Sequence, residues 1–101
     1  LYIPLPDEKL ERRIVSSRIP GIEEGLTKQL VKFVQMLREE DLKKVPSISE
    51  TIDWARVVLL MHADSLDSEL VRDTLNVLLK FEQDITSVER RIPTLVRKSA
   101  E

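Results

Sequence analysis

The stretch EEGLTKQLVKFVQMLREE at residues 23–40 decides the fold class of this chain. Its apolar residues recur at three- and four-residue intervals, which places them along one face of an α-helix. They are Leu26, Leu30, Phe33, Val34 and Leu37. Such a stripe must be covered by other elements. The stretch therefore predicts a helix from Glu23 to Glu40 inside a helical domain.

Helical patterns flank this stretch on both sides. A first helix is expected to open at Asp7–Glu8–Lys9, where acidic residues suit a helix N-terminus, and to stop near Arg18. Three further segments have helical patterns: Ile48 to Met61 or His62, residues 68–80, and the tail from Glu82 onward. Pro93 predicts a kink in the tail or its division into two pieces.

Capping residues and prolines complete the prediction of secondary structure. Ser47 and Glu50 have the spacing of a capping box, and Asp67 or Ser65 can cap the helix at 68–80. Only Leu1 to Leu5 suggests a strand or linker, because residues before proline favour extended backbone. The predicted fold is all-α, a small bundle of four to five helices with short connections.

Composition limits the functional classes. The 101 residues include 16 Lys and Arg against 18 Asp and Glu, a net charge of −2, and no cysteine. One domain is expected, stabilised by packing alone. The charge balance argues against nucleic-acid binding, which needs a clustered cationic surface. No segment has the pattern of a spanning helix or signal peptide, so we expect a soluble, cytoplasmic protein.

Two glycines and one histidine argue against several kinds of site. Gly21 and Gly25 are too few for a dinucleotide-binding loop, and their spacing does not fit a Walker A loop. A lone His62 cannot form a zinc site without cysteine ligands. Its neighbours Asp64 and Ser65 do not make a catalytic relay, whose members usually come from separate elements. We assign no catalytic residue and no metal ligand, and expect His62 to close a helix.

The helix predicted at residues 48–62 is apolar on two faces. One is an ordinary core stripe, formed by Ile48, Ile52, Ala55 and Leu59. The other carries Trp54, Val57 and Met61. Two interpretations are open. Either the helix lies at the centre of the bundle, or its second face meets a partner outside this chain.

Arg56 is the only charged residue in the run from Trp54 to Met61. Asp53, three residues earlier, could pair with it on the helix surface. Alternatively, Arg56 meets an anion delivered from elsewhere, since its forked donors suit phosphate oxygens.

Other charged residues are predicted to be solvated. The run from Arg38 to Lys44 is typical of a helix end and loop. The basic residues near the C-terminus are mixed with acidic ones, which argues against a phosphate-binding track; they are Arg90, Arg91, Arg97 and Lys98.

The segment KVPSISETIDWAR at residues 44–56 resembles the sensor 2 segment of MoxR-type AAA+ ATPases, with its PS-x-x-ET-x-DWAR pattern. LYIPLPDE at residues 1–8 resembles the last strand of the AAA+ core as it passes into the helical lid. Residues 67–85 resemble the late lid helices. The resemblance covers nearly the whole chain. It implies that residues 1–6 end the core and that residues 7–101 form the C-terminal lid.

The resemblance also implies residue roles. Arg56 matches the sensor 2 arginine, which in the family contacts the γ-phosphate of ATP and couples nucleotide state to lid angle. Ile14 and Thr51 fall where lid residues of similar proteins border the adenine and sugar. The face formed by Trp54, Val57 and Met61 would pack on the core domain or on a neighbouring subunit. Mg²⁺ would be held by the core domain.

A complete protein of this family is expected to be an ATP-driven remodelling or metal-insertion chaperone, a homo-oligomeric ring working with von Willebrand A domain proteins. This chain has no Walker A loop, Walker B acid or arginine finger, so by itself it is not expected to be an enzyme. The alternative is a free-standing helical interaction module whose Trp54 face docks a partner helix.

Overall fold

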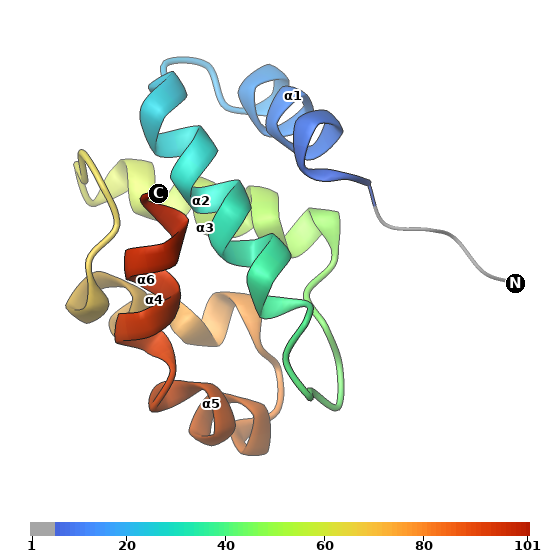
Figure 1. Cartoon of the computed structure of the whole chain (residues 1–101). Helices are drawn as coiled ribbons and strands as arrows, with labels where there is room; N and C mark the ends of the chain where they lie inside the picture. The colour runs from blue at the N-terminus through green and yellow to red at the C-terminus, as the bar shows by residue number, and fades with distance from the viewer. Residues whose placement is uncertain (1–5) are drawn as a thin grey trace, which may run out of the picture.

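The structure, a computed structural model, describes residues 6–101. This part of the chain forms six helices and no strand (Figure 1): α1 (Glu8–Arg18), α2 (Glu24–Leu37), α3 (Ile48–Leu60), α4 (Ser68–Leu78), α5 (Glu82–Glu89) and α6 (Ile92–Ser99). The predicted all-α class is confirmed. The expected strand or linker at Leu1 to Leu5, and with it most of the predicted core-to-lid segment, lies outside the described residues.

Three of the helices begin at side-chain caps, two of which the sequence predicts. The Asp7 carboxylate accepts a hydrogen bond from the Leu10 amide at 2.8 Å, and Asp67 does the same for the amide of Leu70 at 2.8 Å. Ser47 and Glu50 form the complete capping box at the start of α3. These bonds satisfy amides that have no partner inside the helix. Asp67, rather than Ser65, is therefore the cap of α4.

Helix α2 and the tail depart from the predicted bounds. Helix α2 ends at Leu37, and a turn continues to Glu40 through hydrogen bonds from the amides of Glu39 and Glu40 to carbonyls three residues back. The tail divides at Arg90 and Arg91 into α5 and α6, which is one of the two outcomes predicted from Pro93, and the described helices number six rather than the expected four to five. Pro93 lies in the first turn of α6, where its missing amide hydrogen breaks no helical bond.

Helices α2 and α3 form the middle of the bundle, and α3 has three neighbouring helices. Helix α3 packs against α1, α2 and α4, while α6 covers α2 and α4 (Figure 1). Helix α5 packs against α4 at the end of the molecule opposite α1. The largest fully buried side chains in the centre are Trp54 and Phe33, whose ring centroids lie 5.4 Å apart. No helix within residues 6–101 is long and apolar enough to cross a membrane.

Two polar side chains connect segments that are distant in sequence. Asp84 of α5 is buried and accepts hydrogen bonds from the amides of Lys43 at 2.9 Å and Lys44 at 3.2 Å. Gln29 of α2 accepts a bond from the Leu66 amide at 3.1 Å and donates to the Ser99 hydroxyl at 3.4 Å. The loops before α3 and α4 are thus fixed by side chains of other helices.

Helix α3 ends at Leu60, and His62 closes it two residues later, as predicted for the single histidine. The His62 amide donates to the Leu59 carbonyl at 3.0 Å, and the Ala63 amide donates to the Val58 carbonyl at 3.4 Å. These two bonds form a Schellman motif, which requires a left-handed residue at its turn. His62 is that residue, with φ of 57°, and no other non-glycine residue in the described part has positive φ.

Replacement of His62 by glycine is expected to raise the free energy of unfolding by about 1 kcal/mol. The left-handed conformation costs an L-residue with a Cβ atom roughly 1–2 kcal/mol, and the greater freedom of glycine in the unfolded chain offsets part of that gain. Urea unfolding followed by circular dichroism measures the change. The control is His62→Ala, which keeps the Cβ atom. Equal stabilities of the glycine and alanine variants would contradict the prediction.

Candidate functional site

The candidate site lies on α3, which carries Arg56 between two fixed ends. The capping box holds the first turn, and the Schellman motif closes the last one. The Glu50 carboxylate also lies 3.6 Å from the Lys80 ammonium at the end of α4. Arg56 therefore projects from a helix whose backbone is well anchored.

The predicted pairing of Arg56 with Asp53 is present but loose. The Arg56 Nη1 atom lies 3.9 Å from Asp53 Oδ1, and both side chains are more than half exposed, at 57% and 62%. Exposed pairs of this kind contribute little, because water screens both charges. The guanidinium keeps most of its donors open to solvent. Arg56 is thus accessible to an anion from outside the described chain.

The prediction that Trp54 belongs to a partner-facing surface is wrong. Its side chain is completely buried, and its indole Nε1 donates a 2.8 Å hydrogen bond to the Thr74 hydroxyl of α4. The buried residues of α3 form one face that meets α1, α2 and α4: Glu50, Thr51, Trp54, Ala55 and Val58. Of the predicted core stripe only Ala55 is fully buried, while Ile48, Ile52 and Leu59 are half-buried at its border. Trp54 is a core residue that joins α3 to α4, and its ring contacts the Phe33 ring of α2 at a tilt of 40°.

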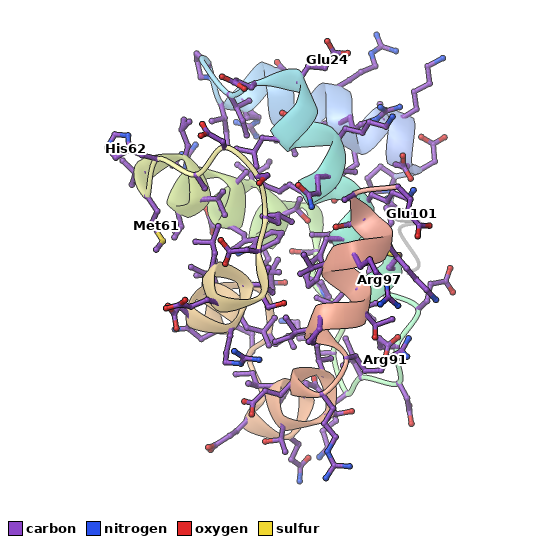
Figure 2. All side chains as sticks on the ribbon, turned by 60° about the vertical axis from the view of Figure 1, so that its left-hand side comes forward. Glu24, Met61, His62, Arg91, Arg97 and Glu101 are labelled. Atoms are coloured by element: carbon purple, nitrogen blue, oxygen red, sulfur yellow. The ribbon has the colours of Figure 1, made fainter. Side chains whose placement is uncertain are left out.

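The other two residues of that predicted face do reach the surface. Val57 is half-buried and Met61 is 49% exposed. Leu60 was not part of the predicted face, but it is the most exposed large apolar residue in the described part, at 73%. Figure 2 shows Met61 and His62 projecting outward from the end of α3. The apolar surface of α3, defined here as Val57, Leu60 and Met61, therefore lies beside Arg56 along the same helix.

The two residues expected near a nucleotide lie in different surroundings. Ile14 of α1 is half-buried and lines a shallow hollow with Leu10 and Arg13. Thr51 is fully buried, and its hydroxyl donates to the Ser47 carbonyl at 3.1 Å. The prediction that Thr51 borders a ligand is wrong, because no part of its side chain is exposed. Ile14 keeps an accessible position.

The main polar feature that the sequence does not predict is a buried ion pair between Arg38 and Glu11. Arg38, predicted to be solvated, has a side chain only 8% exposed, and Glu11 of α1 is fully buried. The guanidinium of Arg38 binds both carboxylate oxygens of Glu11 at 2.7 Å. It also donates to the Pro46 carbonyl at 2.8 Å and the Thr51 hydroxyl at 3.2 Å. This network joins α1, α2 and the start of α3.

The positions of the two charges contain a signal for this pair. Arg38 follows Val34 by four residues and Leu30 by eight, so it continues the apolar stripe of α2. Glu11 precedes Val15 by four residues, and both are buried on the inner face of α1. A charged residue at a stripe position predicts a buried partner, since an unpaired charge is costly in a core.

The site contains no arrangement suited to binding a metal. Within residues 6–101, no group of three or more histidine, cysteine or acidic side chains could hold an ion.

Comparisons with known proteins add no assignment: no family model matches the chain, and no curated protein or solved structure matches it significantly. The candidate site is therefore the exposed Arg56 together with the apolar surface of α3.

Proposed function

We propose that this chain is the nucleotide-sensing lid of a MoxR-type AAA+ ATPase, with Arg56 as the residue that contacts the γ-phosphate of ATP. The observation that carries the proposal is the exposure of Arg56 on an anchored helix, within the segment that resembles sensor 2. In this proposal the chain has no ATPase activity alone. Its complete protein hydrolyses ATP and uses a core domain to hold Mg²⁺.

The physical basis of the proposal is differential affinity. A guanidinium can form two parallel hydrogen bonds to a terminal phosphate, and hydrolysis removes that phosphate. A lid that binds one nucleotide state more tightly than the other shifts its own position when the nucleotide changes. The loose contact with Asp53 leaves the Arg56 donors free to make such bonds.

The apolar surface of α3 supports a partner next to Arg56. Leu60 is 73% exposed and Met61 49%, and contiguous exposed apolar residues mark interaction sites. We propose that this surface packs on the core domain or on a neighbouring subunit of a homo-oligomeric ring. A remodelling or metal-insertion role with von Willebrand A domain proteins, in the cytoplasm, is the corresponding proposal for the complete protein.

Replacement of Arg56 by alanine in the complete protein is expected to lower kcat for ATP hydrolysis at least ~10-fold, or about 1.4 kcal/mol of transition-state stabilisation. The free energy of unfolding should change little, since the Asp53 pair is exposed. Steady-state ATP turnover measures the loss. The matched control is Arg72→Ala, an exposed arginine on α4. Normal turnover by the Arg56 variant would contradict the sensor role.

The alternative is a helical interaction module, and the exposure of Leu60 and Met61 favours it as the second candidate. Its docking face is the apolar surface of α3 rather than Trp54, which is buried. In that case, replacement of Leu60 by aspartate weakens partner binding, and Arg56→Ala has no effect on nucleotide hydrolysis. The two variants therefore distinguish the two functions.

A further inference from the structure

A cation-lined cavity lies between α1 and the start of α2, apart from Arg56. Its volume is about 550 Å³. Three of its lining residues are cationic and one is acidic; the full set is Lys9, Arg12, Arg13, Ser16, Ile22, Glu24 and Thr27. Figure 2 shows Glu24 at the α1 end of the molecule, opposite Arg91. The cavity therefore has a net positive lining.

The three cations of the cavity have no carboxylate partner in the described part of the chain. Other basic side chains there do pair with acids, as Arg38, Lys80 and Arg91 show. The Nε atom of Arg12 is shielded from solvent and makes no hydrogen bond within residues 6–101. The shielded Nε atom does not itself face the cavity, so a ligand there meets the terminal nitrogens of the guanidinium.

The remaining lining suits an anion as well. Helix α2 begins at Glu24 without a side-chain cap, so the amides of its first turn have no side-chain acceptor. Ser16 offers an exposed hydroxyl, and Ile22 supplies an apolar wall. The helix end only supports the argument, which rests on three lining cations without a carboxylate partner within residues 6–101.

We propose that this cavity binds a phosphate group through Arg12, Arg13 and Lys9. Three cations and one carboxylate leave a charge of +2, which matches the charge of about −2 on a phosphate monoester near neutral pH. Two guanidinium forks favour phosphate over a single carboxylate, because phosphate presents three acceptor oxygens. This site is separate from Arg56 and stands or falls independently of the proposed ATP-sensing function.

Titration of the chain with inorganic phosphate tests the proposal, followed by ¹H–¹⁵N correlation spectra at constant ionic strength with chloride as balance. The expected result is saturable shifts of the amides of Ser16, Gly25 and Thr27. Arg12→Gln is expected to weaken binding about ten-fold. The control Arg90→Gln, an exposed arginine at the end of α5 far from α1, is expected to leave binding unchanged.

A second variant is predicted to bind phosphate more tightly, a result that misfolding cannot produce. Glu24→Gln removes the one carboxylate that residues 6–101 contribute to the lining, and it is expected to tighten phosphate binding about three-fold by reducing repulsion. A titration with a phosphoserine peptide distinguishes the source: tighter binding than inorganic phosphate assigns the site to a phosphorylated protein, and equal or weaker binding assigns it to free phosphate compounds. Shifts that chloride reproduces, or that Arg12→Gln and Glu24→Gln leave unaltered, would overturn the proposal.

Discussion

Replacement of Arg38 by alanine is expected to lower the free energy of unfolding by about 3–5 kcal/mol. The variant leaves the Glu11 carboxylate in the core without the guanidinium that binds both of its oxygens. Breaking one half of a buried ion pair has this effect because the remaining charge keeps its desolvation penalty. The Pro46 carbonyl and the Thr51 hydroxyl lose a donor as well. Urea unfolding followed by circular dichroism measures the loss.

Two controls separate the buried charge from lost contacts. The double variant Glu11→Leu with Arg38→Met removes both charges and keeps most of the volume, so it should recover most of the lost stability. Arg91→Ala removes an arginine that is 46% exposed and lies 3.3 Å from Glu40, and it should cost less than about 1 kcal/mol. If Arg38→Ala lowers the free energy of unfolding no more than Arg91→Ala does, the predicted effect of the buried pair between Arg38 and Glu11 is contradicted.

Replacement of Trp54 by alanine is expected to cost about 3–5 kcal/mol. The indole is fully buried between α2 and α4, so its removal leaves a large cavity in the centre of the bundle. It also removes the hydrogen bond to Thr74. Because Trp54 is the single tryptophan, circular dichroism rather than fluorescence must follow the unfolding.

Aromatic controls test whether burial is the cause. Trp54→Phe keeps an aromatic ring but loses the indole donor; the Thr74 hydroxyl still donates to the Leu70 carbonyl at 2.8 Å. Its cost should be about 1–2 kcal/mol. Phe81→Ala removes a side chain that is 46% exposed, and it should cost less than about 1 kcal/mol. A Trp54→Ala variant as stable as Phe81→Ala would place the indole outside the core.

The helices and their starts could be predicted because those signals are local. The stripe from Leu26 to Leu37 depends on spacing along a single helix, and the capping box needs only Ser47 and Glu50, three residues apart. The division of the tail follows from Pro93. In an undivided helix this residue could not donate the hydrogen bond to the carbonyl four residues back, whereas in the first turn of a new helix no such bond is needed. These signals do not depend on which helices become neighbours.

The surroundings of the site residues could not be predicted, because they depend on tertiary neighbours. Periodicity shows that Trp54 lies on the second face of its helix, but only the position of α4 decides that this face is buried. Thr51 is enclosed for a related reason, since Arg38 reaches it from another helix. Arg56 is the counterexample. Within residues 6–101 no helix covers the side of α3 that carries Arg56. The exposed guanidinium therefore leaves the predicted anion contact open to test.

The contact between α2 and α6 has a consequence for synthesis of the chain. The Gln29 and Ser99 side chains that meet there are 70 residues apart, and Lys32 of α2 donates to the Glu101 carbonyl across 69 residues. A ribosome therefore releases the apolar stripe of α2 long before it releases the helix that covers it. During that interval the stripe needs a temporary cover, from α1, α3 or a chaperone. Helix α6 thus completes a core to which α2 contributed much earlier in synthesis.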